Sequence, residues 1–198
     1  MTLPRRAGTP FALLLVAALA LGGCTKDEPD DGLEKDILGT TSTTPPTADQ
    51  TARDAARTKV YEYVNGRNTV LSSPETYLDT SSIGFAEGRE ATSIIAKAAE
   101  LRGKHRKQAG SATLTKDPTP TKVDLEPVAK KGETLFPSVD VTACVDESKT
   151  HLVDDSGAKV PGTTGKGPHR VSFHVLNRSY PDAASWRVAW HKDLKGTC

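Results

Sequence analysis

A few tyrosines and aspartates have the side-chain types needed to move a proton in a binding pocket. An enzyme that isomerises or dehydrates a small molecule needs a general base, and a hydrogen-bond donor for the developing oxyanion. The sequence offers Tyr61, Tyr63, Tyr77, Asp79 and Asp140 for these roles. Their surroundings favour structure instead, because Tyr63 lies in a predicted helix stripe, Asp79 near a predicted helix end, and Asp140 among alternating valines. We therefore predict no catalytic residue.

Histidines are the other side chains that could serve a site, since they bind metal ions. His169 and His174 are five residues apart on a predicted strand, so they face opposite sides of it. In the predicted pairing of the last two strands, His191 lies opposite Arg170 and His174 opposite Arg187. That pairing separates the two histidines by about 13 Å. Because this is too far to share one ion, we expect no metal and no other cofactor.

The elements that must position these residues begin with helices. Apolar residues recur at three- and four-residue steps over residues 48–65, after a capping-box sequence that starts at Thr47. A Ser-Pro-Glu start signal predicts a short helix over 73–78. A third helix is predicted over 86–108.

The second half of the chain changes to a period of two, which predicts strands. Strands are expected at 120–130, 134–146 and 149–153, followed by a final hairpin. We predict a hairpin register that places six apolar side chains on one face, pairing Val171 with Trp190, Phe173 with Val188, and Val175 with Trp186. Helices followed by an antiparallel sheet place the chain in the α+β class.

The N-terminus has the pattern of an export signal. Two arginines precede an apolar run over residues 11–21, which is shorter than the roughly 20 residues that span a bilayer. The run ends in residues that resemble the lipobox of bacterial lipoproteins: Leu21, Gly22, Gly23 and Cys24. The resemblance implies removal of a signal peptide, 1–23, and attachment of diacylglycerol to Cys24. The lipid would anchor the protein at the extracytoplasmic face of the cell membrane. A plain secreted protein is the alternative.

Composition predicts a tether between the anchor and one folded domain. Residues 24–47 are acidic and rich in threonine and proline, which predicts a disordered segment. Residues 48–198 are the right length for a single α+β domain. Its densest basic run, 102–107, lies at a predicted helix end, where cations complement the helix dipole. Contact with a polyanion or a lipid headgroup is the alternative. No pattern of a nucleic-acid-binding module is present.

Two cysteines remain if Cys24 carries lipid. An exported protein meets an oxidising compartment, where a remaining pair usually forms a disulfide, here between Cys144 and Cys198. Closing a loop of about 55 residues would stabilise the fold by ~4 kcal/mol on the chain-entropy model. No Cys-x-x-Cys redox motif or zinc-type spacing suggests another role.

The order of elements resembles the nuclear transport factor 2-like superfamily, an α+β cone that includes ketosteroid isomerase and scytalone dehydratase. The chain is more closely similar to uncharacterised lipoproteins of high-GC Gram-positive bacteria with that fold. The matching segments are residues 143–146 ("ACVD") with Ser148, residues 154–157 ("DDSG"), residues 186–188 ("WRV") and Cys198. The resemblance covers 48–198. It also implies a Cys144–Cys198 disulfide, and it implies no particular activity.

These patterns favour a non-catalytic lipoprotein of the cell envelope. Its domain would bind an envelope protein, a peptide or a small apolar ligand, and would not bind nucleic acid. A small pocket enzyme of the isomerase, dehydratase or cyclase type is the alternative. A buried carboxylate with a raised pKa facing a tyrosine in the pocket would favour that alternative. A module that meets anionic glycans or lipid is a third hypothesis.

Overall fold

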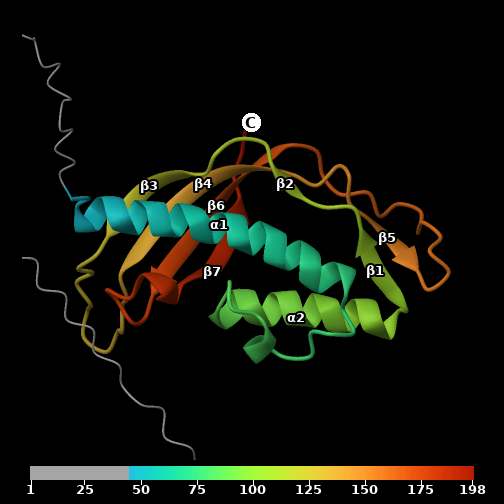
Figure 1. Ribbon diagram of the computed structural model, residues 1–198, viewed down its shortest axis with the longest axis horizontal. Helices are drawn as coiled ribbons and strands as arrows, with labels where there is room; N and C mark the ends of the chain where they lie inside the picture. The colour runs from blue at the N-terminus through green and yellow to red at the C-terminus, as the bar shows by residue number, and fades with distance from the viewer. Residues whose placement is uncertain (1–44) are drawn as a thin grey trace, which may run out of the picture. The chain divides into compact units, whose positions relative to one another are not determined.

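Two helices lie on one face of an antiparallel sheet in the computed structural model, which describes residues 45–198 (Figure 1). The predicted signal peptide, the lipobox and almost all of the predicted tether lie outside the described residues. The helices are α1 (Ala48–Ser72) and α2 (Gly88–Gly103), with short 3-10 helices at η1 (Thr80–Ser82) and η2 (Ala183–Ser185). The predicted α+β class is confirmed in this coarse form.

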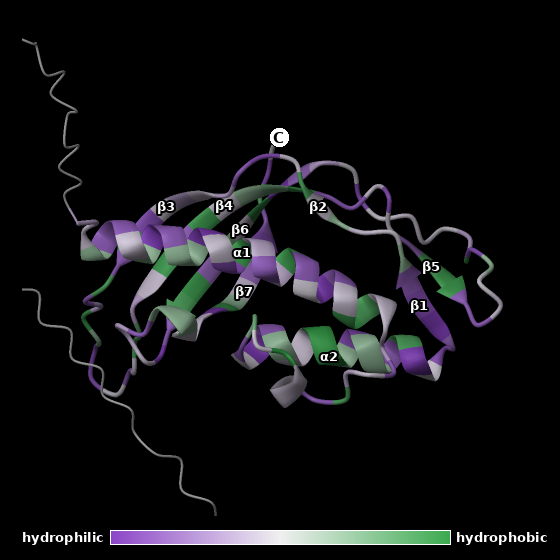
Figure 2. Ribbon diagram, in the orientation of Figure 1, coloured by the Kyte–Doolittle hydropathy of each residue, from purple (hydrophilic) through white to green (hydrophobic). Residues whose placement is uncertain are grey.

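The main sheet has the strand order β2–β4–β6–β7, and β3 pairs with the same edge of β4 as β2 does. Its strands are β2 (Thr113–Leu114), β3 (Thr119–Asp124), β4 (Ser138–Asp146), β6 (His169–Asn177) and β7 (Trp186–Asp193). A separate ribbon pairs β1 (Arg106–Ala109) with β5 (His151–Asp154). The buried hydrophobic residues of the helices and of the main sheet form one core cluster. Hydrophobic residues are coloured green along both layers in Figure 2.

Helix α1 buries the apolar stripe that its sequence predicts. Thr47 caps the helix, because its hydroxyl accepts a hydrogen bond from the Gln50 backbone N–H at 3.2 Å. The helix continues seven residues past the predicted end at residue 65. Tertiary contacts explain the extension, since Arg67 forms an ion pair with Glu147 and the Asn68 side chain donates to a backbone carbonyl at 2.9 Å.

The other predicted helices are partly wrong. Helix α2 ends at Gly103, not at 108, because His105 adopts a left-handed φ of 54° and turns the chain into β1. Residues 73–76 form a turn in place of the predicted short helix over 73–78. Strand β4 lies within the predicted 134–146, whereas β3 stops at Asp124, well before the predicted end at 130.

The predicted register of the last hairpin is wrong. Val175 pairs with Val188, but His174 pairs with Trp190, so Ala189 is an extra residue in a β-bulge. The bulge turns Trp190 to the outer face, where its ring stacks on His174 with ring centroids 5.1 Å apart. The predicted face of six apolar residues therefore loses Trp190.

The observed pairing also changes the predicted partners of the histidines, because it is shifted by two residues near the turn and the bulge adds a third. His191 lies opposite Phe173 on the inner face, and not opposite Arg170. His174 lies opposite Trp190, and not opposite Arg187. Alternation alone could not reveal this change, because one inserted residue reverses the face of every residue that follows it.

The two domain cysteines lie next to each other as free thiols. Cys144 belongs to β4, and Cys198 is the last residue of the chain. Burial and a hydrogen bond with the Cys144 thiol raise the pKa of Cys198. The predicted disulfide is not formed in this structure, although the two thiols lie within hydrogen-bond reach of each other.

Candidate functional site

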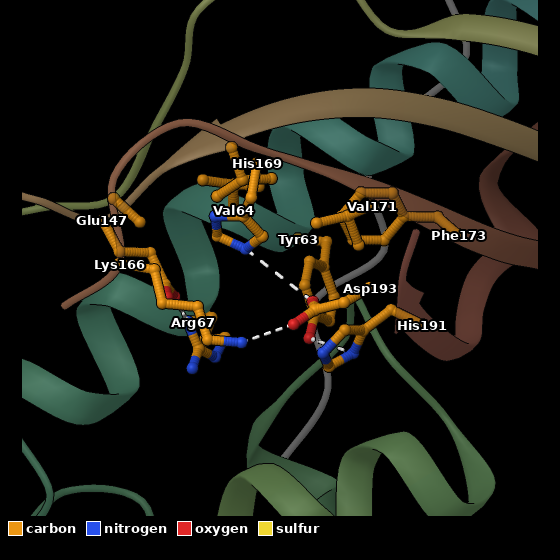
Figure 3. A pocket seen from close by; sticks show the side chains of 12 residues that line it. Tyr63, Val64, Arg67, Glu147, Lys166, His169, Val171, Phe173, His191 and Asp193 are labelled. Carbon is orange, nitrogen blue, oxygen red and sulfur yellow. Dashed lines mark hydrogen bonds and ion pairs between the residues drawn. The ribbon is translucent and has the colours of Figure 1, made fainter. Parts of the chain in front are cut away.

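A cavity of about 330 Å³ lies between α1 and the inner face of the main sheet (Figure 3). Its floor consists of buried apolar side chains from α1, β4 and β6 and from the loop before β2: Val64, Ala112, Val145, Val171 and Phe173. Its sides and mouth are polar, and they carry Tyr63, Arg67, Glu147, Lys166, His169, His191 and Asp193. This volume falls at the lower end of the range for small-molecule sites.

A buried carboxylate organises one wall of the cavity. Glu90, in the first turn of α2, is only 6% exposed. Its Oε1 accepts a hydrogen bond from the Tyr63 hydroxyl at 2.6 Å, and its Oε2 lies 3.0 Å from Nδ1 of His191. The Tyr63 hydroxyl also lies 3.2 Å from the same Nδ1. In this Tyr63–Glu90–His191 network, the Tyr63 hydroxyl, both carboxylate oxygens of Glu90 and Nδ1 of His191 therefore each have a partner.

The charge of Glu90 is stabilised in this setting. Burial raises the pKa of Glu90, but the hydrogen bonds from His191 and Tyr63, together with the charge of Arg67, outweigh burial and lower it overall. The N-terminus of α2 favours a carboxylate as well. Burial and the neighbouring Glu90 raise the pKa of Tyr63 far above its ordinary value, so Tyr63 stays a neutral donor.

The carboxylate also sets the orientation of His191. A carboxylate only accepts hydrogen bonds, so a neutral His191 donates its Nδ1–H to Glu90 and carries a lone pair on Nε2. Within residues 45–198, Nδ1 is the ring nitrogen of His191 that forms hydrogen bonds. Because His191 lines the cavity, Nε2 is available to accept a hydrogen bond, or a proton, from a bound molecule.

Ion pairs surround the mouth of the cavity. Arg67 Nη1 lies 2.8 Å from Glu147 Oε1, and Lys166 forms an ion pair with Asp193. Asp193 Oδ1 also lies 3.7 Å from Nε2 of His169 (Figure 3). The hydrogen bond from Lys166 lowers the pKa of Asp193. These side chains come from α1, the loops flanking β5, and the ends of β6 and β7, and only the fold brings them together.

Of the five residues considered for acid–base chemistry, Tyr63 alone lines the cavity. Tyr61 is exposed and bonds to Asp117. Asp79 caps η1 by accepting from the Ser81 backbone N–H at 2.8 Å. Asp140 lies on the outer face of the sheet, as predicted, where it bonds to His174 at 2.7 Å. The backbone carbonyl of the fifth, Tyr77, accepts from Arg102 at 2.9 Å, which is a structural contact.

Sequence reasoning missed Glu90 and His191. Glu90 had a visible signal, because it lies four residues before Ile94 and so interrupts the apolar stripe of α2 with a charge. No sequence signal pointed to His191, since the bulge in β7 decides which face of the sheet its side chain occupies. In the described part of the chain, no cluster of three or more histidines, cysteines or carboxylates could hold a metal ion.

Comparisons with known proteins leave the family open. No protein-family model matches the chain, and no curated protein matches it. Among solved structures, the chain is similar to the intermembrane space region of the chloroplast protein ARC6, with 14% sequence identity and a TM-score of 0.49. The match covers 73% of this chain and 97% of that chain. Neither helix of residues 45–198 has the length and apolar content needed to cross a membrane.

Proposed function

We propose that this chain is a lipid-anchored protein of the cell envelope whose α+β domain binds a small molecule in the cavity between α1 and the sheet. The cavity carries the binding part of the proposal, because it has a buried apolar floor and a prearranged set of polar groups on its sides. The lipobox-like residues that end in Cys24 support the anchor. A binding role without chemistry remains the favoured function.

The finer fold proposal is the nuclear transport factor 2-like cone. The order of elements supports it, with two helices preceding an antiparallel sheet and an open cavity between the two layers. That fold includes enzymes and binding modules alike, so the activity depends on the residues of the cavity.

The binding proposal is tested by mass spectrometry of the full chain purified from the envelope of its host. We expect the native mass to exceed the denatured mass by that of one small molecule. In the Ala112→Leu variant, the larger side chain would occupy part of the cavity floor and the extra mass should disappear. Tyr61→Phe, outside the cavity, serves as the matched control. Equal native and denatured masses for the unmodified chain would contradict a tightly held ligand.

The membrane anchor has its own test. Replacing Cys24 by serine removes the thiol that would carry diacylglycerol, so we expect the protein to leave the membrane fraction. Labelled palmitate should enter the unmodified chain and not the Cys24→Ser variant. Membrane attachment of the variant equal to that of the parent would overturn the lipoprotein proposal.

A second candidate function is a small pocket enzyme, which the Tyr63–Glu90–His191 network favours. The base in such an enzyme would be Nε2 of His191, with Glu90 as its orienting carboxylate. Glu90 itself does not have the raised pKa expected of a buried acid catalyst. Once the bound molecule is identified, conversion by the parent chain, together with binding but no conversion by His191→Gln, would establish the enzyme. Binding without conversion by the parent would exclude it for that molecule.

A further inference from the structure

We propose that the cavity prefers a small organic cation, namely a primary amine on a short apolar body. The proposal rests on the proposed function, that the cavity holds a small molecule, and it names the class of that molecule. Charge, hydrogen-bond acceptors and the apolar floor support it separately.

The charge around the cavity favours a cation. Two permanent cations, Arg67 and Lys166, and two carboxylates, Glu147 and Asp193, line the cavity. The buried Glu90 lies behind this lining, bonded to Tyr63 and His191. These five groups give a net charge of −1, from two positive and three negative charges. Both permanent cations are already held by carboxylates, so an incoming anion would have to compete for them. An incoming ammonium group would instead neutralise the excess negative charge.

The cavity also offers acceptors for ammonium N–H groups. The lone pair on Nε2 of His191 is set by the hydrogen bond from Nδ1 to Glu90. Arg67 occupies Oε1 of Glu147, and within residues 45–198 the hydrogen bonds leave Oε2 of that carboxylate free. Both residues line the cavity. A primary ammonium group has three donors and no acceptor, which matches this set.

The floor of the cavity suits an apolar body. Phe173 and Val171 line it, and the Tyr63 ring packs edge-on against Phe173 with centroids 5.4 Å apart. These rings and methyl groups would contact an apolar body, and an aromatic wall also attracts a nearby cation. A bare inorganic cation would leave the floor uncovered.

Three probes of nearly equal shape test the charge preference: benzylamine, benzyl alcohol and benzoate. Their affinities for the purified full chain are measured by ligand-observed NMR at low salt and a pH near 8, where the amine is protonated. We expect benzylamine to bind at least about threefold more tightly than benzyl alcohol, and benzoate to bind most weakly. Benzoate as the tightest probe would overturn the proposed class and leave the binding cavity in place.

One ion pair offers a matched set of variants. Glu147→Gln and Arg67→Gln each break the same contact, so their structural losses are alike, but they change the charge of the cavity in opposite directions. We expect benzylamine affinity to fall about threefold to tenfold in Glu147→Gln and to rise in Arg67→Gln. The Asp193→Asn and Lys166→Gln variants should repeat this contrast on the other pair. Equal weakening in both members of a pair would overturn the inference.

The failure of this inference differs from the failure of the proposed function. If no probe binds but the native mass shows a molecule retained with the chain, the amine class is wrong and the binding function stands. If no probe binds and no molecule is retained, both are wrong.

Discussion

At the scale of single residues, Glu90 has the clearest effect on the site. It is a buried charge whose two oxygens accept from Tyr63 and His191, and its removal would leave those two donors without their acceptor. Buried groups left without a partner typically cost about 1–3 kcal/mol. The residue therefore couples the stability of the fold to the geometry of the cavity.

The pH dependence of stability should reveal this coupling. The pKa of Glu90 is lowered in the folded chain from its ordinary value of 4.5, so the unfolded chain binds the proton first as the pH falls. The stabilisation is present at neutral pH and is lost as the pH falls through and below that value. We expect Glu90→Gln to lower the free energy of unfolding by about 1–3 kcal/mol at pH 7.

Urea unfolding of both proteins between about pH 7 and pH 3 provides the measurement. The difference in stability between parent and variant should shrink toward acid pH. The other carboxylates whose pKa values are lowered in the folded chain are present in both proteins, so their contributions to stability cancel in this difference. A difference that is constant with pH would contradict the role given to Glu90.

At the scale of elements, the bulge in β7 decides which side chains reach the cavity. Ala189 is the extra residue, and deleting it would let Trp190 follow Val188 directly. Val188 would still face inward, Trp190 outward and His191 inward. The shortened strand would alternate regularly and keep the present pairs of these residues with β6. We therefore expect the Ala189 deletion to fold and to keep His191 on the inner face.

Deletion of Arg187 is the matched control for this prediction. It would place Val188, which is fully buried, on the outer face, at a cost of about 2–3 kcal/mol. Urea unfolding should show a larger loss for the Arg187 deletion than for the Ala189 deletion. The reverse order would mean that the bulge itself stabilises the sheet.

Helix α1 packs closely against the segment that leads into α2, and Gly66 permits the contact. A Cβ atom at this position would lie 2.3 Å from two ring carbons of Phe85. Alanine favours a helix over glycine by up to about 1 kcal/mol, but overpacking costs about 1–3 kcal/mol. We expect Gly66→Ala to lower the melting temperature.

Gly103→Ala, in the last turn of α2, is the control for Gly66, because no atom lies within 4 Å of its added Cβ. Its melting temperature should stay the same or rise slightly. Equal melting temperatures for the two variants would show that the Phe85 ring moves aside without cost.

At the scale of the whole molecule, the chain end meets the centre of the sheet. Cys198 lies beside Cys144 of β4, and Lys116 donates to the Cys198 carbonyl at 2.9 Å. These contacts hold the C-terminus, where chains usually fray. A bond between the two sulfurs would close a loop of about 55 residues.

Oxidation of the chain should therefore form that bond and stabilise the domain by ~4 kcal/mol. The denatured mass of the oxidised chain should be lower than that of the reduced chain by two hydrogens. Cys198→Ser should unfold at the same urea concentration as the reduced parent, and earlier than the oxidised parent. Two thiols that still react with a thiol reagent after oxidation would contradict the bridge.

The local pattern of the chain was enough to predict several parts of the fold. Regular three- and four-residue spacing located α1 and the start of α2, and the alternation of valines with polar residues located β4. These predictions succeed because each depends on which side of one element is apolar. For the same reason, the outward position of Asp140 was predictable from its neighbours. The location of the protein at the cell envelope, which is inferred from residues 1–24, stays a prediction.

Only the tertiary structure decided the cavity and its chemistry. Tyr63 looked like an ordinary core residue until Glu90 from α2 and His191 from β7 were placed beside its hydroxyl. His191 reaches that place through a single extra residue, which reverses the alternation on which a sequence-based register depends. The residues of this network lie 27 and 128 positions from Tyr63 in the chain. Contacts over such separations depend on how the helices pack on the sheet, and no local pattern contains that information.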